Sequence, residues 1–164
     1  MRAEIEPSEA LPGASPICRI QQEKQMGCDM EITVQTRVPC AQWRTQPAGH
    51  VGLGVNAEPD PRERCYALYA RLAGSNRAGV AHIKPLFADR GVPADLLESR
   101  DVDLDDIGDH HLTWATLAEL RAAPWGMEEL EDTAFLQWLR GPDLSALAAE
   151  FGDDAVRLLF GFNG

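Results

Sequence analysis

The sequence predicts an α+β fold in which three to five helices pack on a small antiparallel or mixed sheet. Alternating apolar residues predict a first strand at about 28–35 and a last strand at about 155–162. Between these strands lie several segments with apolar residues at helical spacing, bounded by residue types that begin or end helices. Strands near both ends, with helices between them, favour a sheet in which the two terminal strands are neighbours.

Residues 1–25 differ from the rest of the chain. They contain three prolines and no sustained apolar period, which predicts a disordered leader or a mis-assigned N-terminal extension. Gln22–Lys24 can be encoded by a purine-rich stretch of the kind that precedes a start codon, so Met26 is the expected start. A flexible interaction arm is the alternative. Residues 26–164 are predicted to form a single α+β domain.

The first half of the domain contains two expected strands and one expected helix. Residues from Cys28 to Gln35 alternate between apolar and polar, and a second strand near Val38–Thr45 is expected to return antiparallel. After a glycine-rich loop at 47–59, Asp60 is placed to cap a helix that begins at Pro61 and ends at Gly74.

The second half begins with an acidic loop from Gly91 to Asp109, in which one helical turn is expected at Ala94–Glu98. Thr116 and Glu119 form the pattern of a capping box, which predicts a short helix that Pro124 stops. Two further helices are expected, at about Met127–Arg140 and at Leu144–Glu150.

The chain is acidic, with 15 lysines and arginines against 26 aspartates and glutamates and a net charge of -11. This charge argues against a nonspecific grip on nucleic acid, which needs clustered basic residues. Neither an apolar run of about 20 residues nor a secretory signal is found, so no membrane association is expected and the cytoplasm is the predicted location. The four cysteines lack Cys-x-x-Cys spacing and are expected to be free thiols.

Several segments together resemble a family of uncharacterised bacteriophage and prophage proteins that begin Met-Gly-Cys-Asp-Ile-His. The matching segments are Met26–Asp29, Arg64–Tyr66, His110–Leu117 and Val156–Asn163. The resemblance implies a start at Met26 and a location in the host cell cytoplasm, but it implies no reaction. The sequence departs from the family pattern at Glu31, Cys65 and His111.

Four residues are candidates for catalysis. Asp29 and Glu31 share the polar face of the first strand, roughly 7 Å apart, and could act as an acid and base pair. His110 and His111 follow the acidic loop, where side chains are often presented to a ligand. Solvated acids and a locally hydrogen-bonded histidine are the alternatives. Cys28 lies on the other face of its strand from Asp29 and is expected to be a core residue.

Five further residues are candidates for substrate binding. Arg64 and Tyr66 could bind an anionic or nucleotide-like ligand near a helix start, although an ordinary surface arginine is equally consistent with the pattern. Thr113, Trp114 and Asn163 occupy polar or aromatic positions of the family resemblance, and Trp114 is alternatively a core anchor.

No metal and no cofactor are predicted. The alternating carboxylates at 101–105 suggest a calcium loop, but Asp106 stands where such a loop needs glycine and Leu112 where it needs glutamate. His110 and His111 have no cysteine partners at a recognised zinc spacing.

Two functions are compatible with the sequence. The favoured hypothesis is a phage-type accessory protein whose acidic Asp95–Asp109 loop binds a basic host protein, with an anti-defence role as one outcome. The alternative is a small enzyme or ligand-binding protein that uses the candidate residues on a polar, nucleotide-like compound.

Overall fold

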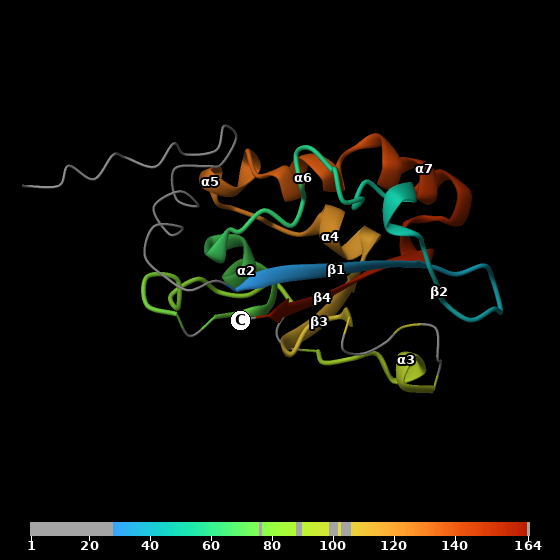
Figure 1. Cartoon of the computed structure of the whole chain (residues 1–164), viewed down its shortest axis with the longest axis horizontal. Coiled ribbons are helices and arrows are strands. Elements are labelled where there is room, and N and C mark those ends of the chain that lie inside the picture. Colours follow the sequence, from blue (N-terminus) through green and yellow to red (C-terminus); the bar gives the residue numbers. More distant parts are fainter. Residues whose placement is uncertain (1–27, 76, 88–89, 99–101, 103–105, 164) are drawn as a thin grey trace, which may run out of the picture.

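A four-stranded antiparallel sheet lies at the centre of the structure (Figure 1). The computed structural model describes residues 28–75, 77–87, 90–98, 102 and 106–163, so the leader predicted at 1–25 lies outside the described residues. The strands β1 (Asp29–Thr36), β2 (Arg44–Thr45), β3 (His110–Thr116) and β4 (Val156–Asn163) are arranged in the order β2-β1-β4-β3. The predicted α+β fold class is therefore confirmed.

The first and last strands are neighbours along their whole length, as the sequence predicts. Their register runs from Asp29 opposite Asn163 to Thr36 opposite Val156. Because β4 lies between β1 and β3, both of its edges are hydrogen-bonded to neighbouring strands, and every residue from Val156 to Phe162 is buried. The two chain ends of the domain thus form the centre of the sheet.

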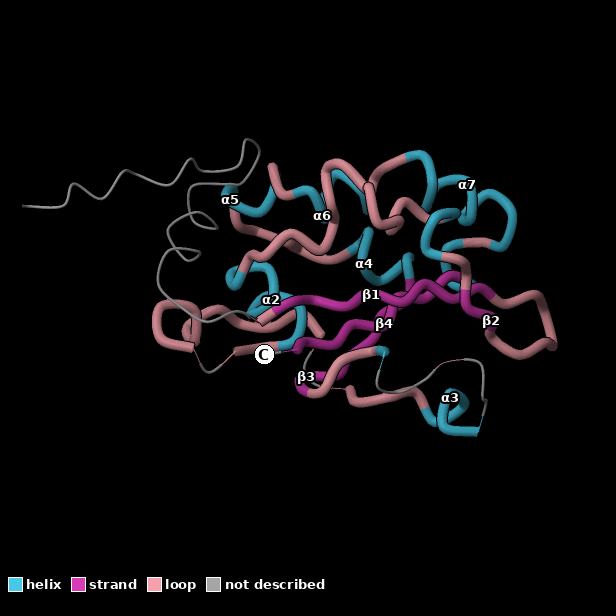
Figure 2. The backbone as a smooth tube through the Cα atoms, viewed as in Figure 1, coloured by secondary structure: helices cyan, strands magenta, loops and turns pink. Residues whose placement is uncertain are grey.

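Helices cover mainly one face of this sheet (Figures 1 and 2). On that face lie α2 (Tyr66–Ala73), α4 (Leu117–Ala122), α5 (Glu128–Glu131), α6 (Ala134–Leu139) and α7 (Pro142–Phe151). The core between them includes the largest fully buried side chains, Met30, Phe135 and Phe160. On the opposite face α3 (Ala94–Glu98) covers a smaller cluster of Leu96, Ile107 and Leu159. Two 3-10 turns, η1 (Ala48–His50) and η3 (Asp153–Ala155), complete the elements.

Two predicted elements in the first half are shorter than expected. The second strand contains only Arg44–Thr45, because the chain turns before it, with Cys40 in a left-handed conformation at a φ of 61°. The helix after Asp60 begins at Tyr66, not Pro61. The Asp60 carboxylate accepts hydrogen bonds from the backbone and the guanidinium of Arg62, which makes a tight turn in place of a helix start.

The second half contains one strand that the sequence did not reveal. Residues 110–116, for which no element was predicted, form β3 and lead directly into α4. The capping box of Thr116 and Glu119 is confirmed at the start of α4. The helix expected at 127–140 is instead two short helices, since Thr133 caps a new helix through its hydroxyl. Among the described residues, no helix is long and apolar enough to cross a bilayer.

Candidate functional site

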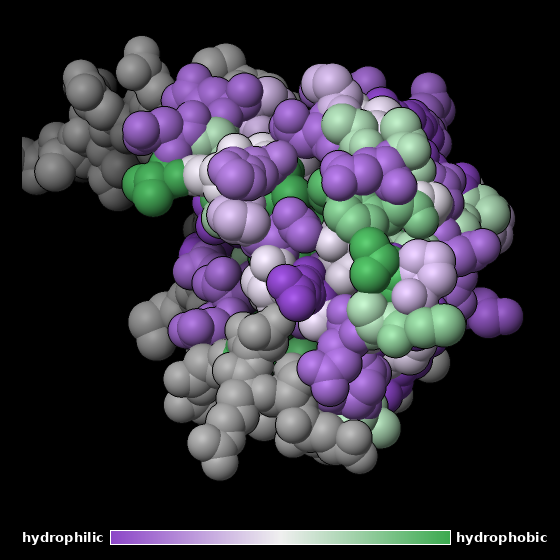
Figure 3. Space-filling view, turned by 90° about the vertical axis from the view of Figure 1, so that its right-hand side faces the viewer, coloured by the Kyte–Doolittle hydropathy of each residue, from purple (hydrophilic) through white to green (hydrophobic). Residues whose placement is uncertain are grey.

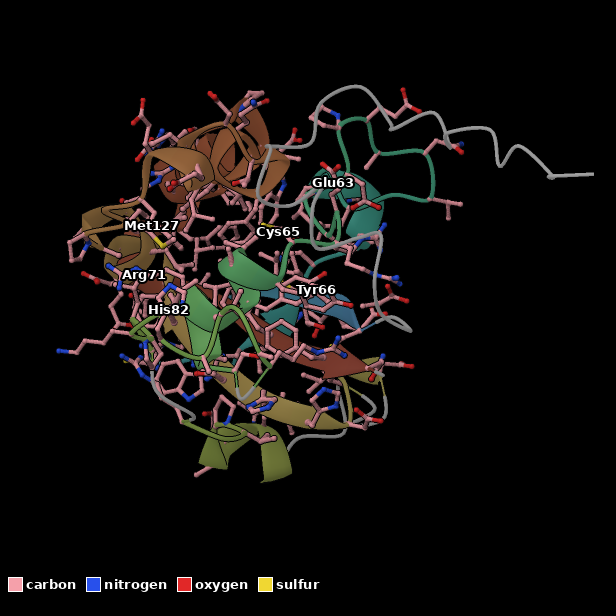
Figure 4. The ribbon with its side chains drawn as sticks, turned by 90° about the vertical axis from the view of Figure 1, so that its left-hand side faces the viewer. Glu63, Cys65, Tyr66, Arg71, His82 and Met127 are labelled. Atoms are coloured by element: carbon pink, nitrogen blue, oxygen red, sulfur yellow. The ribbon has the colours of Figure 1, made fainter. Side chains whose placement is uncertain are left out.

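A pocket of about 250 Å³ lies beside α2, at the end of the sheet where β1 begins and β4 ends. Figure 4 shows α2 from this side, with Tyr66 at its start above the strands. The chain before β1, the chain after α2 and the first residues of β3 complete the lining. The pocket is lined by Cys28, Tyr66, Tyr69, Gly74, Ser75, Arg77, His110, His111 and Phe162.

A β-bulge brings both histidines to this pocket. Neighbouring residues of a regular strand point to opposite faces of the sheet. Here the register between β3 and β4 shifts between His110 and Thr113, and His111 adopts a φ of 51°. The extra residue redirects the side chains, so that the two imidazole rings lie 5.4 Å apart, edge to face, in one pocket. A left-handed conformation at a residue other than glycine is uncommon and is often found at functional sites.

Asp109, just before the histidines, is held by β4. Its backbone N–H donates to the side-chain Oδ1 of Asn163 at 3.0 Å and to the carbonyl of Phe162 at 3.3 Å. The preceding residues pass so close to β4 that a Cβ on Gly161 would lie 1.8 Å from the carbonyl oxygen of Ile107. Glycine at position 161 therefore permits the approach that places Asp109 beside the pocket.

Cys28, His110 and Asp109 form a continuous chain of contacts. The Sγ of Cys28 lies 3.6 Å from Nε2 of His110, and Nδ1 of His110 contacts Oδ1 of Asp109. When Nδ1 carries the ring proton, Nε2 can accept a proton from the thiol while the carboxylate holds the ring in place. A thiol, an imidazole and a carboxylate in this order have the arrangement of a nucleophile, a base and an orienting group.

The Cys28 thiol combines burial with access to the pocket. Its side chain is 5% exposed and packs in the main core, as expected for a core residue, yet it also lines the pocket. Burial raises the pKa of the thiol, and the nearby positive charge of Arg77 opposes this rise. The resting thiol is therefore protonated at neutral pH, and its activation needs a base.

Hydrogen-bond donors line the side of the pocket that α2 forms. The hydroxyl of Tyr69 is buried and, among the described residues, has no partner at ordinary hydrogen-bond geometry. Burial raises the pKa of this phenol, and the backbone of Cys65 opposes the rise only in part. The hydroxyl of Tyr66 accepts the backbone N–H of Cys28 at 3.2 Å and still carries its own proton. The guanidinium of Arg77 lies 4.4 Å from the centre of the Tyr66 ring.

Of the residues predicted for catalysis, the histidines line the pocket and the two acids of β1 do not. Asp29 forms an ion pair with Arg64 at the surface. Glu31 lies half-buried elsewhere on β1, where burial raises the pKa of its carboxyl and the charge of Arg62 opposes the rise. Asp29 is therefore paired with Arg64, while Glu31 lies in a different environment. Neither of the two predicted acids belongs to the lining of the pocket.

Of the residues predicted for substrate binding, Tyr66 alone lines the pocket. Arg64 is held by Asp29, and Asn163 supports the backbone of Asp109. Thr113 is buried and its hydroxyl donates to the carbonyl of Phe87. Trp114 packs against the small cluster on the other face of the sheet, next to the guanidinium of Arg90. This position agrees with the alternative prediction that Trp114 is a core anchor.

Sequence reasoning missed Tyr69, Ser75, Arg77 and the role of Asp109. Tyr69 is one of the buried residues of α2 and also lines the pocket. Asp109 was part of the acidic loop expected to bind a partner. Its position directly before two histidines was the available signal.

The prediction that all four cysteines are free thiols is wrong. Cys28 and Cys40 are free, but Cys65 is disulfide-bonded, and Cys18 lies outside the described residues.

A larger cavity of about 620 Å³ lies between the glycine-rich segment 49–59 and the start of α7. Its charged lining residues are Glu58 and Asp143, and no residue predicted for the site lines it. Figure 3 shows the side of the molecule that carries β2 and α7, where hydrophilic side chains predominate around smaller hydrophobic groups. The smaller pocket is the better candidate because only there do a thiol, imidazoles and a cation converge.

Within the described ranges, no group of three or more histidine, cysteine or acidic side chains is placed to hold a metal ion. No protein-family model matches the chain, and neither does any curated protein or solved structure. The chemistry of the pocket is therefore inferred from its own geometry.

Proposed function

We propose that this protein binds a compact anionic ligand in the pocket between α2 and the sheet. The observation that carries the proposal concerns Tyr69, a residue of the pocket lining whose buried hydroxyl has no hydrogen-bond partner of ordinary geometry among the described residues. A buried polar group of this kind costs roughly 1–3 kcal/mol, and a ligand atom that accepts its proton recovers this free energy.

The charge of the ligand is inferred from the groups around that hydroxyl. Arg77 supplies a permanent positive charge, and His110 and His111 add two further donors or acceptors. The charge of Arg64 is close enough to lower the pKa of the Cys28 thiol, but Arg64 is already paired with the carboxylate of Asp29. An anionic group next to Arg77 would make charge-assisted hydrogen bonds, which are about twice as strong as neutral ones.

The size and shape of the ligand follow from the pocket. A volume of about 250 Å³ is below the range of about 300–1,000 Å³ that holds drug-sized ligands. The rings of Tyr69 and Phe162 lie 4.9 Å apart and form an apolar wall. A small planar acid therefore fits this volume better than a whole nucleotide does. This ligand class is smaller than the nucleotide-like compound that the sequence predicts.

The favoured sequence hypothesis, a basic host partner for the acidic loop, stays a prediction. Two of the loop's described acids have partners within the chain: Asp95 binds Arg157, and Asp109 binds His110. Much of the remaining loop, including 99–101 and 103–105, lies outside the described residues. The pocket therefore supports ligand binding more directly than the loop supports partner binding.

Ligand binding is tested with benzoate and its neutral match, benzamide, by calorimetry and thermal shift. We expect benzoate to bind and benzamide to bind at least tenfold more weakly, since one charged hydrogen bond is worth about 1.5–3 kcal/mol. Arg77→Gln should weaken benzoate at least about tenfold, and Tyr69→Phe about fivefold.

Arg64→Gln is the matched control, because it removes a nearby positive charge that does not line the pocket. Its effect on benzoate affinity should stay within about twofold, as expected for an exposed charge. Equal losses in the Arg77 and Arg64 variants, or equal affinity for benzoate and benzamide, would contradict the proposal.

A further inference from the structure

We propose that Cys28 is the nucleophile of an acyl-transfer site, with His110 as its base and Asp109 as the group that orients the imidazole. The inference deepens the proposed function and rests on it, since the substrate is taken to be a compact ester that carries an anionic group. Cys28 meets a neighbouring pair, Asp109 and His110, from a distant part of the chain, and the two contacts lie beside one pocket.

The geometry is suited to proton transfer from sulfur to nitrogen. Sγ of Cys28 and Nε2 of His110 are 3.6 Å apart, which is within reach of a hydrogen bond that involves sulfur. The contact of Nδ1 with the Asp109 carboxylate favours a proton on Nδ1 and leaves Nε2 free to accept one. Because the resting thiol is neutral, base catalysis by His110 supplies the thiolate at the moment of attack.

In the first half of the reaction, Sγ forms a bond to the carbonyl carbon of the ester as the thiol proton moves to Nε2. The carbonyl oxygen becomes an oxyanion, which a hydrogen-bond donor beside Sγ would stabilise. The bond from carbon to the alcohol oxygen then breaks, and Nε2 returns the proton to the departing alcohol. The product of this half is a thioester on Cys28.

In the second half, water hydrolyses the thioester. The His110 side chain is partly exposed and lines the pocket, so water that enters the pocket can reach the ring. Water gives its proton to Nε2 and its oxygen attacks the thioester carbon, after which the bond to Sγ breaks and Sγ regains the proton. The net reaction converts an ester and water into a carboxylic acid and an alcohol, and it needs no further reactant.

Arg77 and the aromatic wall define the substrate class. The guanidinium lines the same pocket as Cys28 and places a positive charge near the thiol. A small ester with a carboxylate at its far end could therefore bind to Arg77 while its carbonyl group meets Sγ. A neutral ester of the same shape lacks this anchor and should react more slowly.

The experiment measures acetyl transfer from 4-acetoxybenzoate, with phenyl acetate as the neutral match, to the full-length protein. Peptide mass spectrometry locates the acetyl group, and product release is followed at steady state. The exposed free thiol of Cys40 in the same molecule is the internal control. We expect Cys28 to be acetylated at least about 100-fold faster than Cys40, which is within the contribution of a positioned base.

Variants separate catalysis from binding. His110→Ala should lower the rate of Cys28 acetylation about 100-fold, far more than it weakens benzoate binding, because Arg77 remains in the pocket lining. Cys28→Ser should abolish thioester formation, and Cys40→Ser should leave it unchanged. Circular dichroism confirms that each variant is folded, and the comparison of the two thiols in the wild-type protein needs no variant.

Benzoate binding combined with acetylation of Cys28 no faster than that of Cys40 would overturn the acyl-transfer inference and leave the proposed function intact. Rapid, His110-dependent acetylation of Cys28 without benzoate binding would support the nucleophile and overturn the proposed ligand class. Equal acetylation rates in the wild-type protein and the His110 variant would overturn the role of His110 as the base.

Discussion

The thiol of Cys28 lies 3.6 Å from Nε2 of His110, although 82 residues separate them in the chain. The contact exists because β4 pairs with β1 on one side and with β3 on the other, which brings the starts of β1 and β3 to the same end of the sheet. The bulge at His111 then lets both His110 and His111 line the pocket that Cys28 also lines.

This arrangement predicts the tautomer of His110. Because Nδ1 contacts the Asp109 carboxylate, the neutral ring should carry its proton on Nδ1. Nitrogen-15 NMR at about pH 8, where a typical histidine is neutral, distinguishes the two tautomers. His82, an exposed histidine, provides the comparison. A proton on Nε2 of His110 in the wild-type protein, or a tautomer that does not respond to Asp109→Asn, would contradict the arrangement.

The ion pair of Asp95 and Arg157 should contribute strongly to stability. Arg157 is 2% exposed, donates to both oxygens of Asp95 and also donates to Gln35. Asp95→Asn leaves this buried charge without its counter-ion and should lower the free energy of unfolding by about 2 kcal/mol, less than for a fully buried pair because Asp95 is half exposed.

Urea denaturation measures this loss, with Asp153→Asn as the control, since Asp153 pairs with the more exposed Arg121. That control should cost less than about 1 kcal/mol. The hydrogen bonds from Arg157 lower the pKa of Asp95, so its stabilisation is present above the ordinary aspartate pKa and is lost as the pH falls through the lowered value. Equal costs for the two variants would contradict the role given to the buried arginine.

Gly161 should tolerate no side chain. A Cβ there would lie 1.8 Å from the carbonyl oxygen of Ile107, which belongs to the backbone and cannot rotate away. Gly161→Ala should therefore cost about 3 kcal/mol or more in thermal or urea unfolding. Gly49→Ala is the matched control, because nothing lies within 4 Å of its new Cβ, and it should change stability by less than about 1 kcal/mol. A stable Gly161→Ala protein would mean that the Ile107 segment crosses β4 elsewhere.

The capping box at the start of α4 should be worth about 1 kcal/mol. The Thr116 hydroxyl accepts the backbone N–H of Glu119 at 3.2 Å, and the Glu119 carboxylate accepts the backbone N–H of Thr116 at 2.9 Å. Thr116→Ala removes one of these bonds and should destabilise the protein by this amount. Thr116→Ser keeps the hydroxyl and should retain most of the stability. A serine variant as unstable as the alanine variant would assign the loss to packing of the methyl group.

Local patterns in the sequence predicted the elements that depend on local interactions. The alternation after Cys28 and after Val156 predicted β1 and β4, and Thr116 with Glu119 predicted the start of α4. The similar pattern at Asp60 did not begin a helix: its carboxylate accepts the backbone N–H of Arg62, as a cap would, but the chain makes only a tight turn there and the helix begins at Tyr66. A capping pattern predicts a local hydrogen bond and does not by itself predict that a helix continues from it.

The strand β3 was missed because its residues do not alternate regularly. The bulge at His111 interrupts the period of two, and Thr113 is buried while Trp114 is only partly so. Cys28 was placed correctly on the face of β1 that points to the core, but the pocket opens at the end of that same face. Its access to a ligand depends on where α2 ends, which the alternation of a strand does not report.

By itself the sequence determined the fold class, the adjacency of its terminal strands and three of its pocket residues, Tyr66, His110 and His111, because periodicity and residue type act over short stretches of chain. Only the tertiary structure decided that Asp109 and Cys28 flank His110 and that Arg64 is neutralised by Asp29. These contacts join residues that are distant in sequence or redirected by a bulge. They depend on strand order and on the path of the loop over Gly161, which local patterns do not encode.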